Sequence, residues 1–186
     1  LLSSELEKHG FAVERGIAGM ATAFRASLTI GHGGPQLAYL AEYDALPQIG
    51  HGCGHNIVGA SAIFSAIALS KLPSELGGKI TVLGTPDEEG SGGKIPIIAA
   101  GFFEGVDAAI MGHPWNYTSP WMPSVAVDSL TIEFTGKAAH YSTPHKGVNA
   151  LDGVVLTLAT LNSLRHGFRN DVVYGYTIDQ GGVIPS

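Results

Sequence analysis

Nearly continuous apolar runs at residues 37–46, 79–85 and 106–115 are the strongest pattern along this chain. Runs of this length and texture are typical of strands buried on both faces of a sheet. Between them, residues 57–72 and 91–103 are small, apolar and long enough for helices that pack against the strands. This β-α-β-α-β order predicts an α/β fold, with a mostly parallel sheet covered by helices.

Weaker patterns flank these elements. Residues 1–9 have the periodicity of the end of a helix, and Asn56 is placed to cap the helix at 57–72. Residues 21–30 form another strand pattern, separated from 37–46 by the turn sequence GHGGPQ. The two runs and their turn predict a β-hairpin.

The texture changes near residue 122, after a stretch rich in proline and aromatic residues. Residues 125–136 alternate as in a half-exposed strand, 150–166 read as a helix begun by Asn149, and 171–178 read as a second strand. We therefore expect two domains, 1–122 and 123–186. The chain starts within a helical pattern and stops directly after a strand-like run, so we also expect it to be a segment of a longer protein.

Polar side chains follow each of the three buried strand patterns. Asp44 follows the first, the pair Glu88–Glu89 the second and His113 the third. In open α/β sheets, ligands bind at the carboxyl ends of the strands. The loop HGCGHN, which carries His51, Cys53 and His55, precedes a predicted helix and is expected at the same edge.

The composition of the chain argues against several classes of function. The chain has 14% charged residues, a net charge of −6 and no cluster of Lys and Arg, which argues against nucleic acid as a partner. No apolar run approaches the roughly 20 residues that span a bilayer, so no membrane partner is expected. The single cysteine cannot form an internal disulfide, which favours a reducing compartment such as the cytoplasm.

Cys53 allows three interpretations: a small residue in a glycine-rich turn, a nucleophile activated by a neighbouring histidine, or a metal ligand. The nearby carboxylates favour the metal ligand, because thiolate, imidazole and carboxylate are the usual donors to zinc. A thiol hydrolase has no use for the Glu88–Glu89 pair, which makes the nucleophile the weaker alternative.

The other candidates have separate roles in this interpretation. In extended backbone, Glu88 and Glu89 point in different directions, so one can hold a metal while the other acts as general base toward an activated water. His113 is read as a ligand, and Asp44 as the carboxylate that orients a ligating imidazole. His140 is either a surface-loop residue or one that reaches across to substrate.

The motifs EYDALP, HGCGHN, TPDEEG, MGHP and GKAAHYSTPHKGVNALDG occur in order over about 110 residues. In this order and spacing the chain resembles the aminoacylase-type dinuclear metallopeptidases. That family includes hippurate and indole-acetyl-amino-acid hydrolases, p-aminobenzoyl-glutamate hydrolase and related dipeptidases. Asn56 after CGH, together with AEYDALP, resembles the p-aminobenzoyl-glutamate hydrolase and aminoacylase-1-like branch.

The resemblance implies a phosphorylase/hydrolase-like catalytic domain interrupted by a smaller α+β, ferredoxin-like lid that mediates a homodimer. It implies two divalent metal ions, for which zinc is the preferred identity and manganese the alternative. Their ligands would be Cys53, His55, Glu89 and His113, and a further histidine ligand would lie beyond residue 186. Glu88 would be the general base, and His140 would polarise the scissile carbonyl.

The function expected from these observations is hydrolysis of the amide bond of N-acyl amino acids or small dipeptides. Asp44 and His51 would support the ligands without binding metal. Two alternatives stay open: a non-catalytic, metal-binding partner subunit of such an amidohydrolase, and a thiol hydrolase that uses Cys53.

Overall fold

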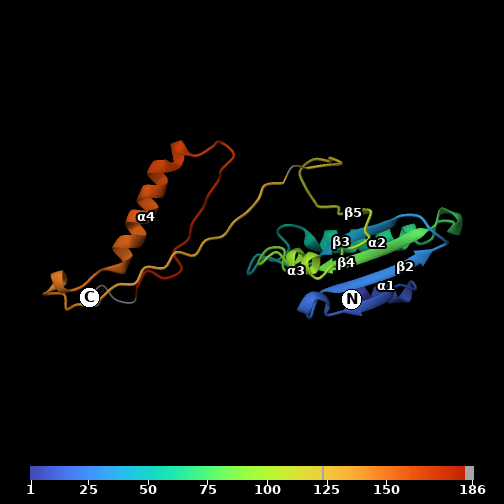
Figure 1. The fold of residues 1–186 in the computed structure, drawn as a ribbon, viewed down its shortest axis with the longest axis horizontal. Coiled ribbons are helices and arrows are strands. Elements are labelled where there is room, and N and C mark those ends of the chain that lie inside the picture. The colour runs from blue at the N-terminus through green and yellow to red at the C-terminus, as the bar shows by residue number, and fades with distance from the viewer. Residues whose placement is uncertain (123, 183–186) are drawn as a thin grey trace. The chain divides into compact units, whose positions relative to one another are not determined.

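The computed structural model describes residues 1–122 and 124–182. The chain divides into two compact units, Leu1–Trp121 and Met122–Ser186 (Figure 1). The first contains a five-stranded sheet with helices, and the second is built around one long helix.

The sheet of the first unit has the order β1-β2-β4-β3-β5. Strand β3 is parallel to both β4 and β5, whereas β2 is antiparallel to β1 and β4. The α/β class is therefore confirmed, but the sheet is mixed rather than mostly parallel. The strands are β1 (Ala12–Arg15), β2 (Phe24–Ile30), β3 (Gln36–Glu42), β4 (Gly78–Thr85) and β5 (Ala108–Ile110), and the helices are α1 (Leu2–Lys8), α2 (His55–Leu69) and α3 (Lys94–Ala99), with short 3-10 turns at Ile17–Gly19 and Ser74–Leu76.

The predicted hairpin between β2 and β3 is wrong, because β4 lies between these two strands. Strand β4 is almost wholly buried, and a central position gives it hydrogen-bonded neighbours on both sides. The connecting segment runs past the start of β4, where the Lys79 N–H donates to the Pro35 carbonyl at 2.9 Å. Burial of the most apolar strand thus overrides the local turn signal.

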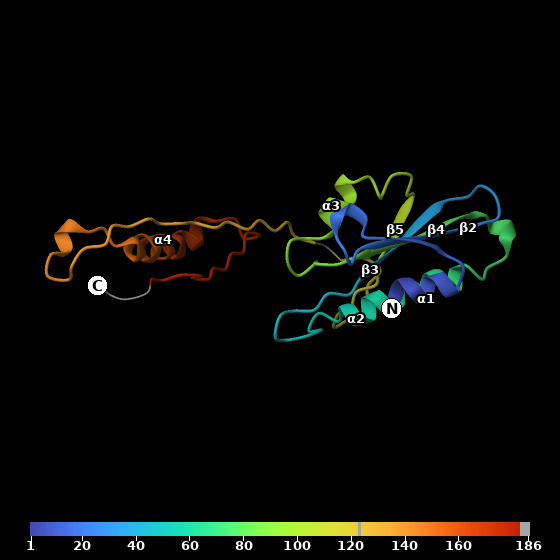
Figure 2. The same cartoon turned by 90° about the horizontal axis from the view of Figure 1, so that it is seen from below.

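Helices cover both faces of the sheet. Helices α1 and α2 pack on one face and α3 lies on the other, as Figure 2 shows. The larger core joins side chains of α1 and α2 to β2, β3 and β4, and includes Leu6, Ile63 and Val82. The smaller core joins α3 to β4 through Ile97 and Leu83.

Helix α2 approaches β3 closely because it is rich in small residues. A Cβ on Gly59 would lie 2.8 Å from the Glu42 carbonyl oxygen, so only glycine fits there. The helix starts at His55, earlier than predicted, and Asn56 is not its cap. The residue before the helix is Gly54, whose left-handed backbone (φ 75°) favours glycine.

Strand β5 differs from its prediction. It is three residues long, lies at the edge of the sheet and is exposed, whereas the sequence indicated a long buried strand. In the part of the chain that the structure describes, β5 pairs only with β3, which leaves its other edge uncovered. An apolar run alone cannot tell a central strand from an edge strand.

The second unit is built around α4 (Ala150–Leu164), followed by a 3-10 turn at Arg165–Gly167; a further 3-10 turn lies at Pro144–Lys146. The Asn149 side chain accepts a hydrogen bond from the Leu151 N–H, as a helix cap does. The strands predicted at 125–136 and 171–178 do not form, because no ladder partner lies beside them among residues 124–182. None of the described residues of this unit is buried.

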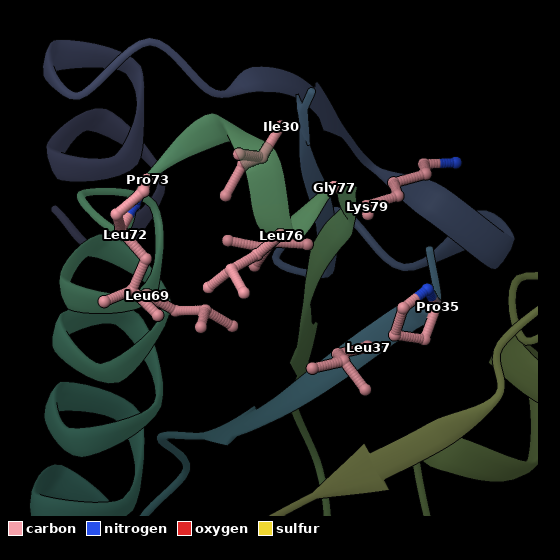
Figure 3. A pocket seen from close by; sticks show the side chains of 11 residues that line it. Ile30, Pro35, Leu37, Leu69, Leu72, Pro73, Leu76, Gly77 and Lys79 are labelled. Carbon is pink, nitrogen blue, oxygen red and sulfur yellow. The ribbon is translucent and has the colours of Figure 1, made fainter. Parts of the chain in front are cut away.

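An apolar hollow lies between the end of α2 and the beginnings of β3 and β4 (Figure 3). It is lined mainly by aliphatic side chains, among them Leu37, Leu69 and Leu76. Because β3 and β4 are parallel, this hollow lies at the opposite end of the strands from Asp44 and Glu88. Among the described residues, no helix is both long and apolar enough to cross a membrane.

Candidate metal centre

The carboxyl ends of β3 and β4 and the first turn of α2 bring the candidate residues of the first unit together. Asp44 follows β3, Glu88 and Glu89 follow β4, and His55 is the first residue of α2. Parallel strands end at the same edge of a sheet, which is why residues more than 40 positions apart in the sequence become neighbours. His113, beyond the end of β5, completes the group.

His55 is the buried centre of this group, with 1% of its surface exposed. Its Nδ1 atom lies 3.2 Å from the Asp44 carbonyl oxygen and 3.3 Å from Asp44 Oδ1. Both of these atoms are acceptors, so Nδ1 carries the hydrogen and, in the neutral ring, Nε2 presents a lone pair.

That lone pair faces carboxylate oxygens. His55 Nε2 lies 3.4 Å from Glu42 Oε2 and 3.7 Å from Glu88 Oε2. Neither His55 Nε2 nor Glu42 Oε2 has a hydrogen-bond partner in the described part of the chain, although both are buried. Buried acceptors that face one another are costly unless a proton or a metal ion lies between them. The geometry therefore fits a bound metal ion.

Asp44 connects the strand ends. Its Oδ2 accepts a hydrogen bond of 2.9 Å from the Glu89 N–H, while Oδ1 faces the His55 ring. One carboxylate thus holds both the loop after β4 and the imidazole of α2. The sequence-based role of Asp44, orienting a ligating imidazole, stays a prediction, and these contacts are what such a role would need.

His113 lies beside His55, with ring centroids 5.5 Å apart in an edge-to-face arrangement. Its Nδ1 lies 2.9 Å from the Pro114 carbonyl oxygen, so Nδ1 donates and Nε2 is free to bind a metal. The side chain is exposed, which opens this part of the centre to solvent.

Among the residues that the structure describes, donor atoms gather in two sets that share His55. One set is Glu42, His55 and His113, and the other is His55, Glu88 and Glu89. Within each set the donor atoms lie within 4.8 Å of one another. Imidazole nitrogen and carboxylate oxygen are donors that zinc and manganese accept.

Cys53 is half-buried beside Glu89 but belongs to neither set. A hydrogen bond to Glu89, burial, and the charges of Glu89, Glu88 and Asp44 raise the pKa of its thiol. A nucleophilic cysteine needs a lowered pKa, usually from a neighbouring cation. These surroundings argue against the thiol hydrolase, whereas a metal ion would favour the thiolate.

The remaining two candidates, His51 and His140, belong to neither set. His51 is exposed, and in the described residues only its carbonyl makes a hydrogen bond, to the Gly54 N–H. His140 belongs to the second unit, where its Nδ1 lies 2.8 Å from Ser142 Oγ and accepts from the Ser142 N–H at 3.2 Å.

Sequence reasoning missed Glu42 and its ion-pair partner Lys94. Glu42 is the last residue of β3 and is 1% exposed, and Lys94 is the first residue of α3. The available signal was a charged residue inside an otherwise apolar run, which is costly to bury without a partner.

Comparison with known proteins identifies the family of the chain. The model of peptidase family M20/M25/M40 matches residues 38–179. The chain is 40% identical to a mouse Xaa-Arg dipeptidase over 90% of its own length and 41% of the relative. It is 35% identical to one of the subunits of the Escherichia coli p-aminobenzoyl-glutamate hydrolase, with 100% of the chain and 43% of the relative aligned.

Two solved structures show the same fold. One is YXEP of Bacillus subtilis, described as a dinuclear metal-binding peptidase from the M20 family, with a TM-score of 0.51 and 26% identity over 58% of this chain and 34% of that one. The other is a putative aminohydrolase from Staphylococcus aureus, with a TM-score of 0.63 and 22% identity over 91% and 50%. The chain spans less than half the length of the curated relatives that it matches. The family match over most of the chain shows that it belongs to peptidase family M20/M25/M40.

Proposed function

We propose that the protein containing this chain is a dinuclear metal-dependent amidohydrolase that cleaves N-acyl amino acids or small dipeptides. The observation that carries the proposal is the pair of donor sets that share His55, beside the two consecutive glutamates. The relatives named above include an Xaa-Arg dipeptidase and a subunit of a p-aminobenzoyl-glutamate hydrolase, which supports this class of substrate.

Cys53, His55, Glu89 and His113 would hold the ions. Zinc suits a set that contains a thiolate and imidazoles, and manganese is the second choice. When bound, the ions supply Lewis acidity that makes water more acidic and polarises the substrate carbonyl.

Glu88 would be the general base. Its side chain is 44% exposed, and its Oε2 lies 3.7 Å from His55 Nε2, so the carboxylate borders both the ligands and the solvent from which water and substrate arrive. It would take a proton from the attacking water and return it to the departing amine, so that the carboxylate is regenerated in each cycle.

His140 would stabilise the negative charge that develops on the carbonyl oxygen. Because its Nδ1 accepts from the Ser142 N–H, the neutral ring carries its hydrogen on Nε2, which is then free to donate. In this proposal residues 1–122 belong to the catalytic domain, and 123–186 belong to a lid through which two copies pair.

A second candidate is a non-catalytic, metal-binding partner subunit. It is favoured by one observation: the Escherichia coli relative is named as a subunit of its hydrolase. Assay of the purified full-length protein alone, with metal supplied, separates the two functions, because a partner subunit would bind metal and show no turnover.

The general base is tested with Glu88→Gln in the full-length protein. Turnover of an N-acyl amino acid and dipeptide panel should fall by about 10²–10⁴. Metal content by elemental analysis should stay at the wild-type level, because the change removes a proton acceptor and keeps the side chain's shape.

Glu75→Gln is the matched control, because Glu75 is exposed and precedes β4, at the other end of that strand. Loss of metal in Glu88→Gln would contradict the assignment of base and ligand. A chelator should inactivate the wild type reversibly, and inactivation by iodoacetamide with resistance to the chelator would instead support the thiol hydrolase.

A further inference from the structure

We propose that Glu42 is an additional metal ligand, which binds through Oε2 the ion that His55 and His113 hold, and that Lys94 anchors its other oxygen. The inference rests on the metal centre of the proposed function and adds a ligand that the sequence motifs did not identify. It starts from the contacts of the last residue of β3.

The Glu42 carboxylate is divided between two different environments. Oε1 forms an ion pair with Lys94 Nζ, which comes from the first residue of α3. Oε2 is buried and lacks a hydrogen-bond partner among the residues described. An ion pair that served the fold alone would be expected to leave neither oxygen unpaired, because a buried lone pair without a partner is costly.

The position of Oε2 fits an ion shared with His55. Two donors at about 2.0–2.1 Å from one tetrahedral ion lie about 3.4 Å apart. The observed separation of Glu42 Oε2 and His55 Nε2 is 3.4 Å. Since His55 Nδ1 carries the ring hydrogen, no N–H of neutral His55 points at Oε2, and a cation can fill the space between them.

His113 completes the set. Its donor atom lies within 4.8 Å of those of Glu42 and His55, and its exposed position leaves one side of the site open to solvent. Two imidazoles and one carboxylate form a donor set that occurs in catalytic zinc sites, with the fourth position left for water or substrate.

Lys94 would act through Glu42 as a positioning residue. Its ammonium group holds one oxygen, which fixes the rotation of the carboxylate while the other oxygen faces the ion. The Lys94 side chain is 25% exposed, so it can turn to solvent when its partner is removed.

The test is metal titration of the full-length protein with Zn²⁺ and Co²⁺, by calorimetry and by competition with a chromophoric chelator. We expect Glu42→Gln to weaken the binding of one of two ions by roughly 100-fold or more and to leave the other ion close to wild type. Lys94→Met should weaken the same ion by about 10–100-fold. The absorption spectrum of the Co²⁺ form should also change, because it depends on the number and geometry of the ligands.

Glu75→Gln, in which an exposed carboxylate is lost, should bind both ions as the wild type does. Glu42→Gln leaves Lys94 without its ion-pair partner, which could impair folding. The double variant Glu42→Gln, Lys94→Met removes both charges together and avoids this problem. The fold of each variant is checked by circular dichroism. Wild-type affinity for both ions in a folded Glu42→Gln or double variant would overturn the inference. If neither folds, unchanged affinity for both ions in Lys94→Met would overturn it. A wild-type protein that binds no metal would instead refute the proposed function.

Discussion

Asp44 offers a sharp test of the metal centre because its two carboxylate oxygens contact different groups. Oδ2 accepts from the Glu89 N–H at 2.9 Å, and Oδ1 lies 3.3 Å from His55 Nδ1. Asp44→Ala removes both contacts, whereas Asp44→Asn can keep the first and reverses the polarity of the second. Comparing the two variants separates support of the loop from control of the imidazole.

In Asp44→Ala the main loss of stability comes from the hydrogen bond of the Glu89 N–H. His55 Nδ1 still has a partner, because the backbone carbonyl of residue 44 lies 3.2 Å away and is not removed by the substitution. A hydrogen bond to a charged group contributes about 1.5–3 kcal/mol. The Asp44 side chain is 19% exposed, so in Asp44→Ala water can partly replace the carboxylate as acceptor for the Glu89 N–H. We therefore expect the free energy of unfolding to fall by about 1–2 kcal/mol.

In Asp44→Asn the amide oxygen can still accept from the Glu89 N–H, so we expect the stability to fall by less than in Asp44→Ala. The amide NH₂ then faces the N–H at His55 Nδ1, and two donors repel. If the ring changes tautomer to relieve this, Nε2 gains a hydrogen that occupies the lone pair facing Glu42 and Glu88. Metal affinity should therefore fall by about 10–100-fold.

The assays are urea unfolding of the metal-free protein and metal competition with a chromophoric chelator. Asp44→Asn should be the more stable variant and should still bind metal far more weakly than wild type. Metal affinity within about twofold of wild type in Asp44→Asn would refute the reasoning, because the imidazole would then not depend on the Asp44 carboxylate for its tautomer.

Two further predictions concern the remaining candidates. His140→Ala should lower kcat/KM by about 10²–10³ with unchanged metal content, because it removes a donor to the developing oxyanion and no ligand; an unchanged rate would remove His140 from the mechanism. In the metal-free protein the pKa of Cys53 is raised, so the thiolate fraction at a given pH is smaller and alkylation by iodoacetamide should be slower than for an ordinary cysteine. Glu89→Gln should lower that pKa and speed the reaction, measured as the rate of modification of the Cys53 peptide from pH 7 to 10; a profile unmoved by this change would contradict the cause given for the shift.

The sequence by itself determined the elements whose signals are local. Strand β4 and helix α4 form close to where the pattern predicts them, and Asn149 caps α4, because periodicity and capping involve residues only a few positions apart. The placement of Asp44, Glu88 and Glu89 after buried strands was also readable, since strand ends in an α/β sheet converge at one edge.

Only the tertiary structure decided how these elements are ordered and which atoms meet. It placed β4 between β2 and β3 and left β5 at the edge, because strand pairing depends on burial across the whole sheet rather than on the adjacent turn. It also showed that Glu42 turns one oxygen to Lys94 and the other to His55, contacts that join residues 52 and 13 positions apart. A charged residue within an apolar run indicates that a charge is buried, but only the packed fold shows which partners stabilise that charge.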